Sequence, residues 1–441
     1  MATSTSIEGL RNYSATVIEV PPLRKAANSD RLYIIDKLGM TAIVDESWHD
    51  RVGKLAILFP AEAQLSERYT QRNNLFRSSD KNLDETQSGY LEDNRRVRSL
   101  KLRGNISNGL VMPLSSLGIY FPEASDLSDF KEGDVFDTVN GEELCRKYTV
   151  PVKESRPTPG KSKVDKAFKR VDSTFLPEHF DTGQYLREEH TIPNDAELII
   201  TQKLHGTSVR LANTVVKRQL TKRERFARKF LGAQIKDHDY DLVAGSRRVI
   251  KDPNNLNQEH YYSSDIWSDA LKLWGDRIPK NHVVYGELVG YLPGSEKPIQ
   301  DGHTYGQVPG TYELYVYRVA IVTEDADLID LSWNQVRAFC ERHDLRHVPE
   351  LDRLPKAMFD VLDFDELNFR EEWISGEINA TPRYNDKPVM LTGGGTGKDE
   401  GIAIREESGM VPNFLKYKNK SHYLYESEQL DTGEADMESQ G

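Results

Sequence analysis

The chain has 441 residues, of which 37% are hydrophobic and 29% are charged, and its formal net charge is −12. This composition excludes disordered and fibrous proteins, and the length is typical of about two or three globular domains. No apolar run reaches about 18 residues and no export signal opens the chain, so we expect no contact with a membrane. Two cysteines, Cys145 and Cys340, are too few for a disulfide framework or a four-cysteine zinc site, which favours a reducing, cytoplasmic compartment.

The first part of the chain predicts a β-rich module. Short apolar or β-branched runs are separated there by Gly, Pro, Asp and Ser, and they occupy residues 13–20, 32–36, 41–44, 54–59 and 109–112. Several short strands in such a length are typical of a small barrel or sandwich. We expect an all-β OB-type barrel that binds nucleic acid over residues 1–150, with a loop containing some helix at 63–94.

A change in composition marks the next boundary. Residues 151–175 are rich in Pro, Gly, Lys and Ser, as linkers often are. Beyond them the pattern alternates between strands, at 197–202, 283–289 and 312–322, and helices, around 221–231, 264–274 and 333–343. The mixture predicts an α+β domain over residues 176–425.

The last residues, 426–441, carry six acids and no base, which is half of the net negative charge. Such a segment is typical of a disordered acidic tail. The total of −12 therefore understates how basic parts of the folded chain are. Bases concentrate in residues 95–103 and in the insert 217–229, whose role the motifs do not assign.

Lys203 is the first candidate for chemistry. It follows the apolar run 197–202 and is the first residue of the glycine-containing segment K-L-H-G-T-S. The lysine therefore lies where a strand ends and a turn begins. A lysine attacks only as a neutral amine, which at pH 7 requires a pKa about 3 below the reference of about 10.4. Alone, this pattern is better explained by a surface lysine beside a turn.

An ordered series downstream favours a reactive lysine. Glu287 lies in an apolar strand flanked by glycines, and Glu400 repeats that design. Lys416 and Lys418 are two residues apart, which places them on one face of a strand. A nucleophilic lysine, acids that orient a sugar or a metal, and a lysine pair for phosphates together fit nucleotidyl transfer.

These segments resemble the motifs of the covalent nucleotidyltransferase superfamily, which contains ATP-dependent ligases and capping enzymes. The corresponding motifs I, III, IIIa, IV and V lie at residues 203–208, 285–287, 315–318, 400–404 and 415–418. A histidine at position 205 resembles the motif of RNA ligases, because DNA ligases and capping enzymes generally have Asp at this position. The predicted OB module precedes the ligase domain and too few residues follow Lys418 for another, an order that resembles the RNA ligase 5 group.

The resemblance implies an ATP-grasp-like nucleotidyltransferase domain and an ATP-dependent RNA ligase. Lys203 would form a lysyl-AMP intermediate with ATP and Mg²⁺ or Mn²⁺. The AMP would pass to a 5′-phosphate end, which would be sealed to an RNA 3′-OH at nicks in duplexes. The partners would be RNA or RNA-containing duplex ends, and the protein would act as a monomer.

The resemblance also implies residue roles. Lys416 and Lys418 would contact the α-phosphate and lower the pKa of Lys203, Glu287 would bind the ribose, and Glu400 would order metal-bound water. Tyr317 would stack on adenine, although the alternation of its strand also fits a core position. The remaining contacts, to phosphate, acceptor or RNA, would come from Arg247, Ser208, Arg210, Arg95, Arg96, Arg98, Lys101 and Arg103.

Two other readings stay open. A DNA ligase or guanylyltransferase of the same superfamily would share most of these motifs, and preference for GTP would support the latter. A catalytically silent protein that binds nucleic-acid ends would retain the basic segments without forming an adenylylated species. The basic segments themselves are also compatible with solvated surface.

Overall fold

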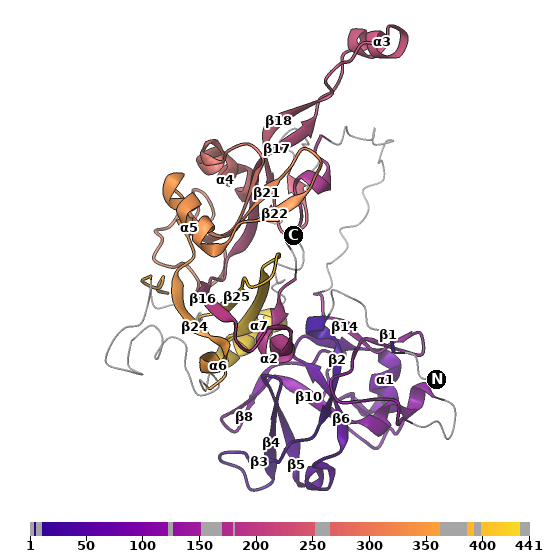
Figure 1. The fold of residues 1–441 in the computed structure, drawn as a ribbon. Coiled ribbons are helices and arrows are strands. Elements are labelled where there is room, and N and C mark those ends of the chain that lie inside the picture. The colour runs from indigo at the N-terminus through magenta and orange to yellow at the C-terminus, as the bar shows by residue number, and fades with distance from the viewer. Residues whose placement is uncertain are drawn as a thin grey trace.

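The computed structural model describes residues 4–5, 11–121, 127–150, 170–179, 181–251, 265–361, 386–391 and 398–432. Figure 1 shows a β-rich N-terminal region in indigo and purple beside a mixed α/β region that runs to yellow. The fold is therefore mixed α/β. Most of the predicted linker, residues 151–169, lies outside the described residues.

The N-terminal region is built on an antiparallel sheet with the strand order β10-β6-β2-β11. Its strands are β2 (Ala15–Glu19), β6 (Leu55–Pro60), β10 (Gly109–Pro113) and β11 (Val135–Phe136). Because side chains alternate along a strand, Ile57 and Phe59 pack into one core while Ala56 and Leu58 pack into another on the opposite face. This sheet is buried on both sides.

Smaller elements complete the N-terminal region. The second core is covered by a three-stranded sheet of β3 (Arg24–Lys25), β4 (Leu32–Lys37) and β5 (Met40–Asp45). The others are β1 (Ser4–Thr5), β7 (Ala63–Leu65), α1 (Glu67–Arg72), β8 (Leu100–Leu102), β9 (Asn105–Ser107), β12 (Thr138–Val139), β13 (Glu142–Glu143) and β14 (Cys145–Lys147). The predicted strands and the loop with a helix are confirmed. The predicted OB-type barrel is not, because the described strands pair into separate sheets and form no closed ring.

The C-terminal region contains two sheets that meet at the turn after Lys203. One has the order β15-β26-β25-β16-β24, and the other β19-β18-β17-β20-β21-β22 with β23 paired to β21. The first comprises β15 (Gly183–Gln184), β16 (Glu197–Lys203), β24 (Glu350–Pro355), β25 (Gly401–Glu406) and β26 (Asn413–Lys418). The second comprises β17 (Thr207–Lys217), β18 (His238–Gly245), β19 (Ile250–Lys251), β20 (His282–Gly290), β21 (Tyr312–Val322), β22 (Leu328–Asp330) and β23 (Arg346–His347).

Helices close one side of the second sheet. Trp267 of α4 (Ile266–Trp274) and Trp333 of α5 (Trp333–Arg342) belong to the same core as Val316 of β21. Each helix begins at a side-chain cap, since Asp265 and Ser332 accept hydrogen bonds from the first-turn backbone. The predicted helices are confirmed as α3 (Lys222–Phe230), α4 and α5. The remaining helices of this region are α2 (Tyr185–Glu188), α6 (Lys356–Phe359) and α7 (Lys420–Thr432).

The predicted disordered tail is wrong for residues 426–432, which form the second half of α7. Ser427 is 1% exposed, and its hydroxyl donates to Glu62 at 2.5 Å and accepts from the amide of Ser99 at 2.9 Å. These contacts fix α7 to the N-terminal region. Two acids of the helix are paired with bases, Glu426 with Lys418 and Asp431 with Arg96 and Arg98. Residues 433–441 lie outside the described part of the chain.

The predicted domain start at residue 176 is also too late. Arg170 pairs with Asp241 at 2.8 Å, and Val171 is buried in the same core as Leu176. The polar composition of residues 170–175 conceals these contacts, because one arginine and one valine suffice to attach the segment. The folded C-terminal region therefore begins by residue 170.

Candidate active site

Lys203 lies at the junction of the two C-terminal sheets. It is the last residue of β16, and its backbone pairs with Gly401 at the start of β25. The turn then passes through Gly206, where a Cβ atom would lie 2.2 Å from the carbonyl oxygen of Leu288. Only glycine fits this close approach. The same holds for Gly401, which has a φ of +137° and would bring a Cβ within 2.1 Å of the Tyr417 oxygen.

Glu400 faces Lys203 across this junction. Its Oε2 atom lies 2.8 Å from Lys203 Nζ, its Oε1 atom lies 3.3 Å from Lys418 Nζ, and its side chain is 2% exposed. Burial alone raises the pKa of Glu400, but the charges of Lys203 and Lys418 outweigh it and lower the pKa to about 2. The structure thus holds a buried carboxylate, ionised at neutral pH, between two lysines.

The two lysines of β26 diverge in their contacts. Lys416 lines a cavity together with Lys203. Lys418 pairs with Glu400 and also with Glu426 of α7, and although burial lowers the pKa of Lys418, these two carboxylates raise it well above its ordinary value. The sequence-based prediction missed Glu426, because its acidic surroundings resemble a solvated tail.

Predicted nucleotide-binding residues gather around one cavity of about 950 Å³, a volume that includes the part open to solvent. Six of its lining residues belong to the predicted set: Lys203, Ser208, Arg247, Glu287, Tyr317 and Lys416. The size is within the range of small-molecule sites. The two C-terminal sheets both contribute, which explains why these residues are far apart in sequence.

Glu287 is oriented by the turn that carries Lys203. Its Oε1 atom accepts a hydrogen bond from the amide of Gly206 at 2.9 Å, and the Ser208 hydroxyl donates to its Oε2 atom at 3.4 Å. The residue is 6% exposed and belongs to β20, next to β17. The carboxylate is therefore fixed at the cavity wall before any ligand binds.

Two further cavity residues have polar partners. Tyr317 is half-buried and its hydroxyl lies 2.7 Å from His179 Nδ1, while Arg247 donates to Asp181 at 2.6 Å. Because Arg247 is 16% exposed at its side chain, a phosphate could reach it by competing with Asp181. The half-buried ring of Tyr317 packs against two cores and lines the cavity, so it is compatible with stacking as well as with core packing.

Arg210 differs from the prediction that it contacts an acceptor end. It is fully buried, and its Nε and Nη1 atoms donate to the carbonyl oxygens of Ser246 and Leu176, both at 2.7 Å. A side chain so enclosed cannot contact RNA. It joins β17 to the segment before β16 and to the turn that carries Arg247.

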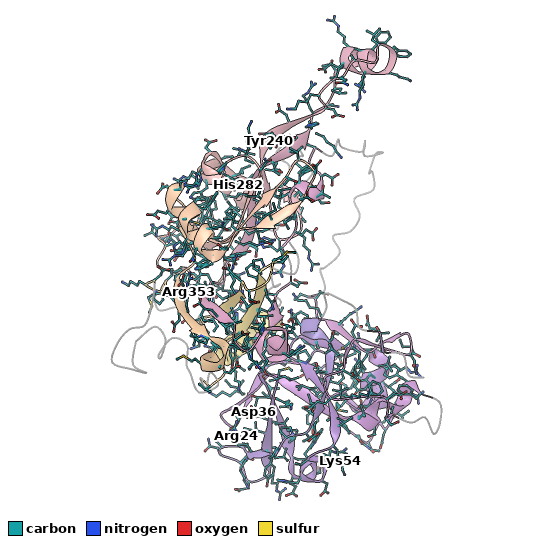
Figure 2. All side chains as sticks on the ribbon, viewed as in Figure 1. Arg24, Asp36, Lys54, Tyr240, His282 and Arg353 are labelled. Atoms are coloured by element: carbon teal, nitrogen blue, oxygen red, sulfur yellow. The ribbon has the colours of Figure 1, made fainter. Side chains whose placement is uncertain are left out.

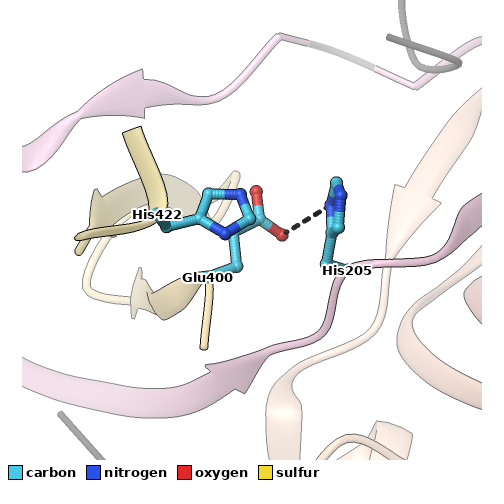
Figure 3. Close-up of side chains that lie close together, drawn as sticks. All are labelled: His205, Glu400 and His422. Carbon is cyan, nitrogen blue, oxygen red and sulfur yellow. Dashed lines mark ion pairs between the residues drawn. The ribbon is translucent and has the colours of Figure 1, made fainter. Parts of the chain in front are cut away.

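Three histidines surround Glu400, although no spacing in the sequence indicated a metal site. The ring centroid of His205 lies 4.7 Å from that of His303 and 4.9 Å from that of His422. Figure 3 shows His205 and His422 on either side of Glu400, with His205 Nδ1 3.8 Å from Glu400 Oε2. No local pattern could have found this group, because its members come from a turn, a loop and a C-terminal helix.

The group around Glu400 could hold a divalent cation. Donor atoms of His205, Glu400 and His422 lie within 4.8 Å of one another. Burial, followed by the neighbouring His303 and His422, lowers the pKa of His205 well below its ordinary value, so the ring is neutral and keeps a lone pair for a metal. One carboxylate with two imidazoles suits Mn²⁺ or Zn²⁺, whereas Mg²⁺ prefers oxygen ligands.

Glu400 gives a pH prediction. Its pKa falls from 4.5 to about 2 on folding, so the unfolded chain binds this proton at higher pH than the folded protein does. Its contribution to the free energy of unfolding is therefore complete above about pH 4.5 and is lost as the pH falls toward 2. We expect Glu400→Gln to remove about 2 kcal/mol of this acid-dependent loss, as measured by urea unfolding between about pH 3 and pH 6.

The matched control for this prediction is Glu428→Gln, which alters an exposed acid of α7. The control should keep the acid dependence of the wild-type protein. If Glu400→Gln loses stability with falling pH as steeply as the wild type, the assignment of a depressed pKa to Glu400 is wrong.

The predicted RNA-binding segment of the N-terminal region is only partly exposed. Arg95 pairs with Glu67 at 3.1 Å, and Arg98 pairs with Asp431 of α7. Lys101 and Arg103 are exposed on the β8–β9 hairpin. These two are the members of the segment that lie most open to a strand of RNA.

Arg96 differs from the prediction that it contacts RNA. It is 1% exposed, lies over the ring of Tyr148 at 5.1 Å, and pairs with Glu62 at 3.1 Å and with Asp431. Its Nη2 atom also donates to the carbonyl oxygen of Ser427 at 3.2 Å. Arg96 therefore contacts protein instead of RNA, because α7 folds over it.

Comparisons with known proteins agree with this geometry. An RNA ligase of Naegleria gruberi, solved as an apo mutant, shares 16% identity with a TM-score of 0.53 over 95% of this chain and 99% of its own. The same ligase with pyrophosphate gives 16% identity and a TM-score of 0.53 over 96% and 100%. A mutant of that ligase with ATP and manganese gives 14% and 0.52 over 95% and 99%. These likenesses establish a common fold.

No curated protein matches this chain. Within the described residues, no helix has the length and apolar character needed to cross a membrane. A family model described as RNA ligase matches residues 196–418, which is just over half of the chain. The chain therefore belongs to the RNA ligase family.

Proposed function

We propose that this RNA ligase uses ATP, forms an AMP adduct on Lys203 and seals 5′-phosphate ends to RNA 3′-OH ends, chiefly at nicks in duplexes. One observation carries the proposal: Lys203 lies at a cavity lined by Glu287, Tyr317 and Lys416, and Glu400 lies 2.8 Å from its amine. The solved complexes of the Naegleria ligase with ATP and with AMP, both with manganese, support the choice of nucleotide and metal.

In the first step the Lys203 amine attacks the α-phosphorus of ATP, a phosphorus–nitrogen bond forms and the bond to pyrophosphate breaks. Lys416 lies where it can neutralise the charge that spreads over the phosphate oxygens. Glu287 would hold the ribose, and Tyr317 would cover the adenine. Arg247 and Ser208 would contact phosphates at the cavity wall.

Glu400 creates a requirement for the first step. A carboxylate 2.8 Å from the Lys203 amine favours the ammonium form, whereas attack needs the neutral amine. Lys418 neutralises Glu400 in part from 3.3 Å. A divalent cation held by His205, Glu400 and His422, or by water bound to Glu400, would supply the further positive charge that lowers the pKa of Lys203.

In the later steps AMP passes to the RNA 5′-phosphate as a phosphoanhydride, and the RNA 3′-OH then displaces AMP to form the phosphodiester. The N-terminal region would bind the duplex as an OB-type barrel, and the C-terminal region would act as an ATP-grasp-like nucleotidyltransferase domain. Lys101 and Arg103 are the exposed bases that favour this use of the N-terminal region. We further propose a monomeric, cytoplasmic enzyme.

The test is to incubate the protein with ATP and Mg²⁺ or Mn²⁺ and to measure its intact mass. We expect a gain of one AMP, and no adduct with GTP. Adduct formation from GTP in preference to ATP would favour a guanylyltransferase, and no adduct from either nucleotide would leave a protein that only binds ends.

A second assay tests the RNA assignment. Two nicked duplexes, identical except for RNA or DNA at the 3′-OH side, should be sealed at different rates, with RNA preferred by at least about tenfold. Equal sealing would favour a DNA ligase.

A further inference from the structure

The helix α3 stands apart from the rest of the protein. The ladder of β17 and β18 runs from the pair Arg210–Gly245 out to the pair Lys217–His238, and α3 follows at its tip. Figure 1 shows α3 at the far end of this hairpin, away from both folded regions. Tyr240, labelled in Figure 2, lies where the hairpin leaves the body of the domain. Nothing in the active site requires so long an extension.

Local interactions maintain α3 without help from packing. Thr221 and Glu224 form a capping box, in which each side chain accepts a hydrogen bond from the other's backbone amide. Glu224 also pairs with Arg218 at 2.9 Å, and Arg228 pairs with Asp237 at 2.7 Å. The tip is therefore a defined helix rather than a loose loop.

The apolar side chains of the tip are exposed. Phe226, Phe230 and Leu231 are 58%, 64% and 72% exposed, and the two rings lie together with centroids 4.8 Å apart. Water covers this surface at a cost in free energy, because no described residue packs over it. Clustered exposed aromatic residues generally mark a contact surface.

The remaining bases of α3 give the tip a strong positive charge. Four of them are exposed and form no ion pair with another described residue: Lys222, Arg223, Arg225 and Lys229. Lys229 also lies over the ring of Phe230, with its Nζ atom 5.4 Å from the centroid. Exposed cations next to aromatic rings are the combination that binds phosphates and stacks on unpaired bases.

We propose that α3 is a second RNA contact, which binds an unpaired strand flanking the break. This rests on the proposed function, because it assumes that the polyanion near this enzyme is RNA. β17 extends from Thr207, beside the Lys203 turn, to Lys217, just before α3, and its ten steps at ~3.3 Å correspond to roughly 33 Å. That distance corresponds to about ten base steps of a duplex at ~3.4 Å each.

The test measures binding rather than sealing. The probes are nicked RNA duplexes with a blocked 3′ end and about ten base pairs on each side, with or without single-stranded tails of about 15 nucleotides. We expect the wild-type protein to bind the tailed RNA at least about tenfold more tightly, as measured by fluorescence anisotropy over a range of salt concentrations.

Two variants separate charge from stacking. Replacing the four exposed bases of α3 with serine should abolish the preference for tails and reduce the salt slope by about 3, since each phosphate contact with a single strand contributes about 0.7. The double substitution Phe226→Ser and Phe230→Ser should lower the affinity for the tail by about fivefold or more with little change in that slope.

The matched control removes the same charge elsewhere in the domain. Its four substitutions to serine affect exposed bases far from the tip in sequence: Lys272, Lys280, Arg342 and Arg346. This control should keep the preference for tails. The proposal is overturned if the control loses as much as the α3 variant, or if the wild type binds tailed and untailed RNA equally.

A membrane surface, the other possible ligand of α3, would give a different result. Sedimentation of the wild type, but not of the phenylalanine variant, with anionic phospholipid vesicles would overturn the proposal if the preference for tailed RNA is absent. Failure of the proposed function is recognised separately, because it would appear as a missing AMP adduct while binding to the tails persists.

Discussion

Lys203→Ala is expected to abolish the AMP adduct and to reduce the sealing of 5′-phosphate RNA by at least about a thousandfold, because the variant lacks the nucleophile. The measurement combines intact mass after incubation with ATP and a gel assay of sealing. Lys203→Arg should be equally inactive, since a guanidinium remains protonated at any pH at which the protein is folded. It retains a positive charge beside Glu400, so it controls for loss of the ion pair.

Pre-adenylylated RNA distinguishes a missing nucleophile from a damaged site. If Lys203 only carries AMP, the alanine variant should seal RNA that already bears a 5′-adenylyl group, without ATP. Sealing by the variant from ATP and ordinary 5′-phosphate RNA would contradict the assignment of Lys203. Failure with both substrates, together with a lowered melting temperature, would show instead that Lys203 maintains the fold around Glu400.

Arg96→Ala is expected to lower the free energy of unfolding by about 3–5 kcal/mol, the usual cost of removing one partner from a buried charge pair. Arg96 has no exposed side-chain surface, and its loss leaves Glu62 without its cation, while Asp431 keeps only its pair with Arg98. It also removes the hydrogen bond to the carbonyl oxygen of Ser427, which helps to hold α7 on the N-terminal region. Urea unfolding measures the effect, and faster proteolysis of α7 should accompany it.

Arg95→Ala is the matched control, since the neighbouring residue has the same side chain in a different environment. Its ion pair is with Glu67, which is 80% exposed, so its removal should cost no more than about 1 kcal/mol. Equal losses for the two variants would contradict the buried role of Arg96. A specific loss of RNA binding by Arg96→Ala at unchanged stability would restore the original prediction that it contacts RNA.

Local sequence patterns predicted several of the longer strands and helices. Alternating apolar runs correspond to β16, β20 and β21, and helical spacing corresponds to α4 and α5, because those signals depend on neighbours a few residues apart. The order of lysines and glutamates also indicated nucleotidyl transfer. Each of these residues lies at a strand end or in a glycine-flanked strand, and residues nearby in sequence are enough to predict such strands.

Patterns of charge were less reliable because they do not show what covers a residue. Arg96 and Arg210 resemble surface bases in sequence, yet both are buried by segments distant along the chain. Glu426 resembles a tail residue, yet it pairs with Lys418. In each case the outcome depends on a long-range contact, which the residues near it in sequence do not specify.

The family, the two folded regions and the residues expected to carry the chemistry were predictable from the sequence, because short motifs and periodicities encode them. Three features depend on contacts between distant segments and were not predictable: His205, His303 and His422 surround Glu400, α7 joins the active site to the N-terminal region, and α3 stands on an extended hairpin. These features arise where two sheets and a terminal helix meet. The net charge of −12 likewise does not describe the charge of the surface, since acids such as Glu400 and Glu426 are paired with lysines inside the protein.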